Sequence, residues 1–268
     1  MKLFAFDVDG TLINNHNIVL KDNLKERLNE ILKRGDAIVI ASGRPYPGII
    51  QIFNQLGEGK RFCACSNGSL VTDINGNTIY ECGLKAKDFY EFIKNHQSIM
   101  NNPHSNIYCY SGLNYGYFKN DYWTKFEAQA NGDFKGINLK KHPLDPNDTI
   151  LKFMIASRAR RSKYFDEKQI SDEEKKKFSV VRSSEFYIEF INKDSDKANA
   201  VEFLRQYLNI DEKDIYTFGD SGNDVKMIER FNGVAMGNAI DECKKVAKFI
   251  TRSVDEDGII YALDNFVK

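Results

Sequence analysis

The chain has 268 residues, which is long enough to bury a large core and close to the length at which one core commonly becomes two domains. Its 38 Lys and Arg residues balance its 38 Asp and Glu residues, so no basic excess favours binding to nucleic acid or to an anionic membrane. No apolar run approaches the roughly 20 residues of a membrane span, and charges come too early for a signal peptide, so we expect a cytoplasmic protein.

The amino-terminal part of the chain alternates apolar runs with an amphipathic stretch. Three runs have the length of buried strands and end in polar residues: 3–6 before Asp7, 37–41 before Ser42, and 62–65 before Ser66-Asn67-Gly68. Between the first two, apolar side chains recur on one face from Leu20 to Leu32, and Gly35 follows. This pattern predicts a helix that ends near the glycine. The alternation is typical of a parallel sheet with helical crossovers.

The middle of the chain, residues 84–188, has a different character and is predicted to form an inserted α+β domain. Its strand candidates are rich in tyrosine and lie at 107–110, 115–118, 149–156, around 180 and at 186–188. Its helix candidates lie at 88–96, 121–130 and 162–178. The charged run 171–177 within the last of these is interpreted as a solvated helix face.

The carboxyl-terminal part returns to the first pattern. We expect a helix at 197–208, a strand at 215–218, a second strand near 234–236 and a helix from about Asp241. These elements would complete the sheet that the amino-terminal part begins. The predicted organisation is therefore an α/β core formed by residues 1–83 and 189–268, with the domain 84–188 inserted into it.

Two groups of acidic residues follow strands of the predicted core. The D-x-D spacing of Asp7 and Asp9 proves little by itself, since 194–196 and 255–257 share it. Only the first pair, however, lies directly after an apolar strand and before a Gly-Thr turn, where ligands of open α/β sheets bind. Asp220 and Asp224 follow the strand at 215–218. If the two strands are neighbours, the carboxylates converge and favour Mg²⁺; the alternative is that they only cap helices and turns.

Two further residues supply the complement to these acids. Ser42 follows the strand 37–41 and offers a hydroxyl, and Lys197 stands at the opening of a predicted helix, where anions are favoured. On its own, Lys197 would be interpreted as a solvated surface lysine. The five cysteines are scattered, contain no C-x-x-C pair, and indicate neither a zinc site nor a disulfide framework.

In chain order, five motifs together resemble the signature of the haloacid dehalogenase superfamily and, within it, the Cof-type phosphatases: Asp7-Val8-Asp9-Gly10-Thr11, Ala41-Ser42-Gly43-Arg44, Ser66-Asn67-Gly68, Lys197, and Gly219-Asp220-Ser221-Gly222-Asn223-Asp224. The segments 234–239 and 255–258 are similar to that subfamily too. The resemblance implies a Rossmann-like parallel-sheet core with a large inserted α/β cap. One departure is Ala198, where many relatives carry glycine.

The resemblance also implies residue roles. Asp7 would be the nucleophile that forms an aspartyl-phosphate, and Asp9 would be the general acid and base. Mg²⁺ would be held by the carboxylates of Asp7, Asp220 and Asp224 and by the main-chain carbonyl of Asp9, with Asp224 either binding directly or supporting the ligands. The residues expected around the substrate phosphate are Thr11, which orients the loop, Ser42, Gly43, Lys197 and Asn223.

The function predicted from these roles is Mg²⁺-dependent hydrolysis of small phosphorylated metabolites, with sugar phosphates the favoured class. The protein would act as a monomer or weak homo-oligomer. Two alternatives remain: a phosphotransferase or phosphohexomutase with the same chemistry, and a non-catalytic protein that binds phosphometabolites, although the latter needs neither Asp7 nor Asp9. The residues that could reach a leaving group, each with an ordinary surface or packing interpretation, are Arg44, Asn67, Arg182, Glu185 and Tyr187.

Overall fold

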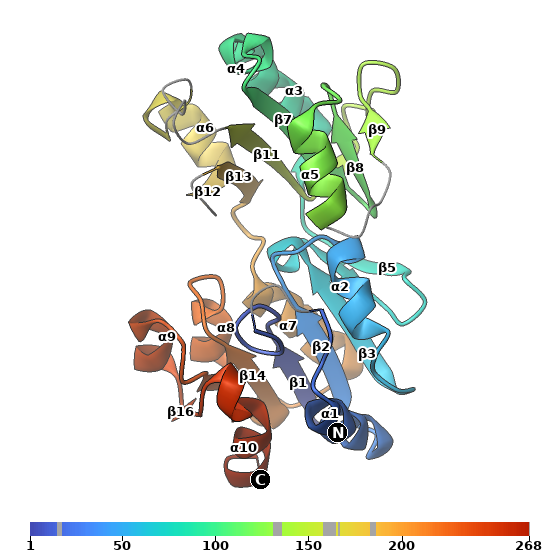
Figure 1. Cartoon of the computed structure of the whole chain (residues 1–268), viewed down its shortest axis with the longest axis vertical. Helices are drawn as coiled ribbons and strands as arrows, with labels where there is room; N and C mark the ends of the chain where they lie inside the picture. Colours follow the sequence, from blue (N-terminus) through green and yellow to red (C-terminus); the bar gives the residue numbers. More distant parts are fainter. Residues whose placement is uncertain (15–17, 131–135, 158–164, 166, 183–185, 268) are drawn as a thin grey trace. The chain divides into compact units, whose positions relative to one another are not determined.

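The computed structural model describes residues 1–14, 18–130, 136–157, 165, 167–182 and 186–267. The chain divides into two compact units (Figure 1). One unit joins Met1–Tyr80 to Asp196–Lys268, and the other, Glu81–Ser195, is inserted between these segments. The insertion predicted at 84–188 lies within the second unit, which extends further because β13 (Tyr187–Asn192) pairs with β11 (Lys152–Ser157) in its sheet.

The first unit is built on one eight-stranded sheet with the order β16-β15-β14-β1-β2-β3-β4-β5 (Figure 1). Its strands are β1 (Leu3–Phe6), β2 (Ala37–Ala41), β3 (Lys60–Cys65), β4 (Leu70–Thr72), β5 (Thr78–Glu81), β14 (Ile215–Gly219), β15 (Asn232–Ala235) and β16 (Phe249–Ile250). The pairs from β16 to β3 are parallel, and β4 runs antiparallel to β3. The strand after the insertion, β14, lies directly beside β1, as the predicted convergence of the acidic groups requires.

The central strands are buried on both faces, which explains their continuous apolar sequence. In β1, Leu3 and Ala5 face a core that also contains Val201 and Leu204 of α7 (Lys197–Leu208). Successive side chains of a strand point to opposite faces, so the aromatic rings of Phe4 and Phe6 lie on the other side. There they stack on Tyr216 and Phe218 of β14.

Nine helical segments accompany this sheet: α1 (Asp22–Lys33), α2 (Tyr46–Phe53), η1 (Ser66–Gly68), α7, η4 (Glu212–Asp214), α8 (Val225–Arg230), α9 (Asp241–Val246), η5 (Val254–Glu256) and α10 (Gly258–Asn265), counted over the described residues. The predicted helix between the first two strands is α1, which buries Leu24, Leu28 and Leu32. It ends where the sequence indicates, because the N–H of Gly35 bonds the carbonyl of Leu32 at 2.9 Å.

The second unit contains a six-stranded sheet with the order β12-β13-β11-β7-β8-β9 and a two-stranded sheet of β6 and β10 (Figure 1). The strands not yet bounded are β6 (Leu84–Lys85), β7 (Ser105–Ser111), β8 (Asn114–Tyr117), β9 (Ile137–Asn138), β10 (Thr149–Ile150) and β12 (Phe178–Arg182). All pairs in the larger sheet are antiparallel except β8 with β9. The fold class is therefore confirmed: a largely parallel α/β core carries an inserted α+β cap.

The helical segments of the cap are α3 (Ala86–Asn95), α4 (Gln97–Asn101), α5 (Tyr122–Ala130), η3 (Glu167–Gln169) and α6 (Asp172–Lys177). Phenylalanines dominate its core, where the ring of Phe92 on α3 lies 4.7 Å from that of Phe190 and the rings of Phe153 and Phe190 stack at 4.4 Å. None of the helices in the described part of the chain combines the length and apolar character needed to cross a membrane. None of the five cysteines, all of which lie among the described residues, forms a disulfide.

One helix prediction for the cap is wrong in extent. A single helix was expected over 162–178, but α6 begins only at Asp172, and residues 162–164 and 166 lie outside the described part. The reason is local: the Ser171 hydroxyl accepts the N–H of Glu174, and the Glu174 carboxylate accepts the N–H of Ser171. This capping box starts a new helix at that point. The exposed face predicted for 171–177 is present, except that Glu174 is buried.

Candidate active site

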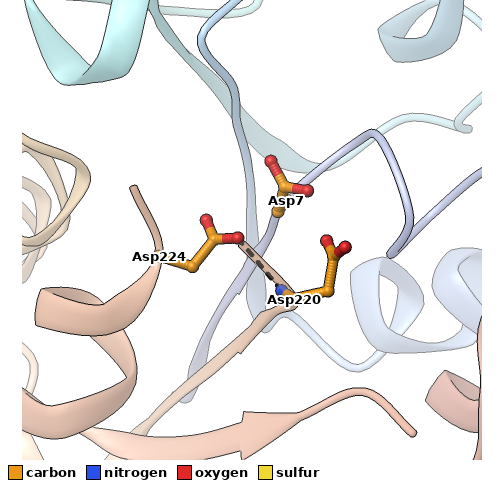
Figure 2. A group of neighbouring side chains, drawn as sticks. All are labelled: Asp7, Asp220 and Asp224. Carbon is orange, nitrogen blue, oxygen red and sulfur yellow. Dashed lines mark hydrogen bonds between the residues drawn. The ribbon is translucent and has the colours of Figure 1, made fainter. Parts of the chain in front are cut away.

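Three carboxylates converge at the carboxyl edge of the first unit's sheet (Figure 2). Asp7 follows β1 and continues the ladder, because its N–H bonds the carbonyl of Phe218 on β14 at 3.0 Å. Asp220 follows β14, and Asp224 precedes α8. One carboxylate oxygen of each lies within 4.8 Å of the others. The convergence predicted from strand ends is therefore present, and Asp9 is the predicted acidic residue whose carboxylate lies outside this cluster.

Lys197 brings a buried positive charge to the cluster. It is the first residue of α7, whose preceding residue, Asp196, caps the helix by accepting the N–H of Asn199. The side chain of Lys197 is 0% exposed, and its Nζ lies 2.5 Å from Oδ1 of Asp7 and 2.6 Å from Oδ1 of Asp224. The interpretation as a solvated surface lysine is therefore wrong.

The loop after β14 fixes the other oxygens. Oδ2 of Asp224 accepts the backbone N–H of Asp220 at 3.0 Å (Figure 2). It also accepts the N–H of Ser221 at 3.0 Å, so this carboxylate holds its own loop closed. Oδ1 of Asp220 accepts the hydroxyl of Thr11 at 3.1 Å. Thr11 is buried, and this bond ties the loop after β1 to the loop after β14.

Two of the three carboxylates, Asp7 and Asp220, have raised pKa values because they are buried beside other negative charges. Burial raises the pKa of Asp7, and the negative charge of Asp224 raises it further, while Lys197 acts in the opposite direction. Burial also raises the pKa of Asp220 to about 6, again with help from Asp224. The pKa of Lys197 is raised, since the attraction of Asp224 and Asp7 outweighs its own burial.

The donor set fits a divalent cation. Three carboxylates against one ammonium leave a negative excess in a largely buried volume, which is unfavourable without further positive charge. Carboxylate oxygens without His or Cys neighbours are the ligands that Mg²⁺ prefers. Asp7 and Asp220 carry the raised pKa values, so they are the residues that would gain most from a metal ion. Asp7, Asp220 and Asp224 are therefore suited to hold a divalent metal ion.

The predicted phosphate ligands follow strands that end at the same edge of the sheet. Ser42 follows β2, is buried, and its Oγ accepts the N–H of Arg44 at 3.1 Å. Gly43 comes next in the same loop. Asn223 is exposed, and its Nδ2 donates to Oδ1 of Asn67 at 2.8 Å. Thr11 follows β1, and Lys197 begins α7. The candidate ligands therefore come from the loops after β1, β2 and β14 and from the start of α7.

Arg44 is a residue whose position the sequence alone did not predict. Its Nε and Nη2 donate to Oδ2 and Oδ1 of Asp9 at 2.9 and 2.5 Å, which is a bidentate ion pair. The Asp9 side chain is 39% exposed and is held by this pair rather than by the carboxylate cluster. Arg44 was a sequence candidate for contact with a leaving group, and the structure places it on Asp9 instead. Its place two residues after Ser42 was the available signal.

Asn238 is a residue near the site for which the sequence predicted no role. Its Nδ2 donates to the carbonyl of Gly10 at 2.8 Å, and its Oδ1 accepts the N–H of Val254 at 2.9 Å. It therefore links the loop after β1 to the segment 254–258. Gly10 has a φ of +85°, and a Cβ there would lie 2.4 Å from Oδ2 of Asp220, so the predicted turn requires glycine.

Of the other candidates for contact with a leaving group, Asn67 lies in the first unit, where its side chain bonds Asn223. The others belong to the segment 81–195. Arg182 ends β12, and Tyr187 begins β13. Glu185 lies outside the described residues. They stay predictions of the sequence.

Comparison with known proteins agrees with this geometry. Residues 4–263 match the family of haloacid dehalogenase-like hydrolases. The chain belongs to that family. It is 30% identical over 285 residues to YxeH of Bacillus subtilis (strain 168), with 99% of this chain and 98% of YxeH covered.

Two further proteins are similar to nearly the whole length of this chain. The 5-amino-6-(5-phospho-D-ribitylamino)uracil phosphatase YwtE of Bacillus subtilis (strain 168) is 27% identical over 296 residues, covering 100% of this chain and 98% of YwtE. A haloacid dehalogenase-like hydrolase from Bacteroides thetaiotaomicron superposes with a TM-score of 0.84 at 27% identity, covering 98% of each chain. The chain is a phosphatase of the haloacid dehalogenase type.

Proposed function

We propose that the protein is a Mg²⁺-dependent phosphatase that hydrolyses small phosphorylated metabolites, sugar phosphates among them, through an aspartyl-phosphate on Asp7. The observation that carries the proposal is the cluster of Asp7, Asp220 and Asp224 around buried Lys197, at the sheet edge where ligands of open α/β folds bind. Mg²⁺, when bound, would polarise a phosphoryl oxygen and offset repulsion between anionic groups.

Hydrolysis of a phosphate monoester demands cooperation between many groups. Accelerations reach about 10²¹ for such reactions, on the order of 28 kcal/mol at roughly 1.36 kcal/mol per decade. General acid catalysis contributes only about 10²- to 10⁴-fold. A nucleophile, a proton carrier, cations and fixed donors must therefore all act on one phosphoryl group.

Asp7 is the carboxylate placed to be the nucleophile. It continues directly from β1, so the sheet fixes its backbone, and Lys197 favours its ionised form against the opposing effects of burial and Asp224. Its attack on phosphorus forms the aspartyl-phosphate and releases an alkoxide. The ammonium of Lys197 has three N–H donors, of which Asp7 and Asp224 take two, so one remains for a phosphoryl oxygen.

Asp9 is proposed as the proton carrier. In the first step a carboxylic acid at this position protonates the leaving alkoxide, and in the second step the carboxylate takes a proton from the attacking water. Its partial exposure and its place two residues after Asp7 suit proton exchange with both the leaving alkoxide and the attacking water. The main-chain carbonyl of Asp9 is proposed as an additional metal ligand.

The phosphoryl oxygens are proposed to meet donors from three loops: the hydroxyl of Ser42, the backbone N–H of Gly43, the ammonium of Lys197 and the amide of Asn223. Thr11 supports them indirectly, since its hydroxyl bonds Asp220. These groups recognise phosphate only, so the choice of leaving group is assigned to the cap. The name of YwtE, a phosphatase of a ribityl phosphate derivative, supports a small phosphorylated metabolite as the substrate class.

The test is release of phosphate from p-nitrophenyl phosphate with and without Mg²⁺. We expect turnover that chelation abolishes and added Mg²⁺ restores. Asp9→Asn should lower the rate with an alkyl phosphate by at least about 10²-fold but affect the aryl phosphate less, because nitrophenolate leaves without protonation. Equal effects on both substrates would remove Asp9 from the acid role.

A matched control uses another D-x-D aspartate of the chain. Asp255 belongs to the segment 255–257 and pairs with Asn14 at 2.7 Å. Asp255→Asn should leave turnover within about twofold of the wild type. A screen of phosphorylated metabolites with the wild-type protein then identifies the substrate, and failure of every phosphomonoester, including the aryl one, would contradict the proposed function.

A further inference from the structure

The segment Ser66-Asn67-Gly68 has an unusual backbone. Three consecutive residues have positive φ: +50° at Ser66, +58° at Asn67 and +84° at Gly68. Glycine adopts this region freely, whereas other residues are strained there, asparagine least. Such strain persists only where the surroundings determine the conformation, and it concentrates at functional sites. The contacts of the turn show what determines it.

The backbone of the turn holds the loop that carries Ser42. The N–H of Ser66 bonds the carbonyl of Arg44, and the N–H of Asn67 bonds the carbonyl of Ser42, both at 2.9 Å. The turn thus extends the pairing of β2 with β3 beyond the strands themselves.

The same turn packs against the start of α7. A Cβ added to Gly68 would lie 2.3 Å from the carbonyl oxygen of Asp196 and 3.1 Å from Cβ of Ala200, so no side chain fits. Asp196 is the N-cap of the helix that begins with Lys197. The turn is therefore in direct contact with the backbone that sets the position of the buried lysine.

The side chain of Asn67 reaches the third loop. Its Oδ1 accepts Nδ2 of Asn223 at 2.8 Å and lies 3.0 Å from the position of a Cβ on Gly43. Asn223 is exposed and adjacent to Asp224. The side-chain bond to Oδ1 of Asn67 is thus an anchor across to the neighbouring loop.

We propose that Asn67 is a positioning residue: its Oδ1 holds the side chain of Asn223 so that Asn223 and the Ser42–Gly43 loop act on the same phosphoryl group. This inference rests on the proposed phosphatase function and adds a residue whose effect passes through Asn223. Asparagine suits the position for two reasons, because it tolerates the left-handed conformation and presents an acceptor oxygen.

The test compares Asn67→Gly with the wild type. Glycine keeps the left-handed backbone without strain and removes only the acceptor side chain. We expect the KM for p-nitrophenyl phosphate and the inhibition constant of inorganic phosphate to rise together by about fivefold, the effect of one hydrogen bond. The melting temperature is measured in parallel to show that the variant is folded.

The chain offers a matched control in Asn209. It also has a left-handed backbone, with φ of +53°, but caps the far end of α7 and is exposed. Asn209→Gly makes the same chemical change on the same conformation, and both constants should stay within about twofold of the wild type. A fivefold rise in this variant as well would overturn the inference, since any such substitution would then suffice.

The link to Asn223 is tested by a double-mutant cycle. If Asn67 acts through Asn223, the Asn67→Gly/Asn223→Ala protein has the same inhibition constant for phosphate as Asn223→Ala alone. The inference is contradicted if the double variant shows the product of the two single effects, or if Asn67→Gly has the wild-type inhibition constant for phosphate. Either result leaves the phosphatase function intact. An inactive wild-type protein with Mg²⁺ contradicts both.

Discussion

Lys197 shows how one residue can be both structural and functional. Its ammonium is withdrawn from water, which is costly, and it stays buried because it donates hydrogen bonds to two carboxylates at 2.5 and 2.6 Å. The same arrangement keeps Asp7 and Asp224 from facing each other without a cation. Removing the lysine therefore does more than delete one phosphate ligand.

We predict that Lys197→Met lowers the free energy of unfolding of the first unit by about 3 kcal/mol in metal-free buffer, because it leaves buried carboxylates uncompensated. Amide hydrogen exchange of β1 and β14 measures this quantity. Lys226→Met is the control, since Lys226 pairs with Asp196 at 2.9 Å but is 66% exposed, and it should cost less than about 1 kcal/mol. Equal losses in the two variants would refute the role assigned to burial.

At the residue scale, the sequence predicted which side chains converge but not how they pair. Convergence followed from strand ends, because Asp7 and Asp220 each follow an apolar run. Pairing depends on side-chain conformations across loops, as in the ion pair of Arg44 with Asp9 and the hydrogen bond from Asn238 to the carbonyl of Gly10. Neither the period of apolar residues nor a motif reports such contacts.

At the scale of elements, the turn at 66–68 can be tested through its glycine. Gly68 and Gly35 have nearly the same φ, +84° and +82°, but a Cβ on Gly35 meets nothing within 4 Å. Gly35→Ala should therefore cost only the left-handed strain, roughly 1–2 kcal/mol. Gly68→Ala should cost at least about 2 kcal/mol more, because its Cβ would overlap the carbonyl of Asp196. Hydrogen exchange of β1 and β2 measures both.

If the two alanine variants lose equal stability, the close approach between the turn and α7 does not constrain the fold. The comparison is informative because both glycines lie in the first unit and differ mainly in what surrounds them.

The capping box of α6 gives a pH prediction for the cap. Burial alone would raise the pKa of Glu174, but hydrogen bonds from Ser171 and from His96 outweigh it and lower the pKa. A carboxyl group with a lowered pKa adds stability above its unfolded pKa, about 4.3, and loses it as the pH falls through the folded value. Glu174→Gln should therefore destabilise the cap at pH 7 by about 1 kcal/mol. Below about pH 4.3 the free energy of unfolding of the cap should fall less steeply with pH in this variant than in the wild type.

Fluorescence of Trp123, the single tryptophan of the chain, follows this transition because it lies buried in the cap. Glu173→Gln is the control, since Glu173 is exposed in the same helix. An unchanged pH profile in Glu174→Gln would contradict the prediction.

The prediction of helices succeeded where one apolar face continued and failed where a helix-capping motif interrupted it. The helices α1 and α7 could be predicted because apolar side chains recur on one face of each, Leu24 and Leu28 in α1 and Val201 and Leu204 in α7. The expected helix 162–178 ignored Ser171, although a serine three residues before glutamate is itself a start signal. The strands of the core were easier, since burial on both faces leaves a continuous apolar run.

At the scale of the whole molecule, the site joins parts of the chain that the inserted cap separates. Asp7 comes from the segment before the cap, and Asp220 and Asp224 come from the segment after it. A metal ion bound by all three links the two segments in the folded state only. The order of the elements along the chain predicted this split, because the strand-helix pattern stops near residue 84 and returns near Lys197.

We predict that Mg²⁺ raises the melting temperature of the first unit, since a ligand that binds only the folded state stabilises it by about 2.7 kcal/mol at 100 times its dissociation constant. Asp220→Asn should abolish the rise, whereas Asp255→Asn should keep it. Calorimetric scans with EDTA and with Mg²⁺ measure the shift, and an equal shift in Asp220→Asn would contradict the assigned ligands.

The central claim is that Asp7 carries the phosphoryl group during turnover, and acid-quenching the protein with its aryl phosphate substrate tests it most directly. We expect mass spectrometry to locate an acyl phosphate on Asp7 in the wild type and to find none in Asp7→Asn, which should also be inactive. A phosphoryl group on a different residue, or robust turnover by pure Asp7→Asn protein, would contradict the account.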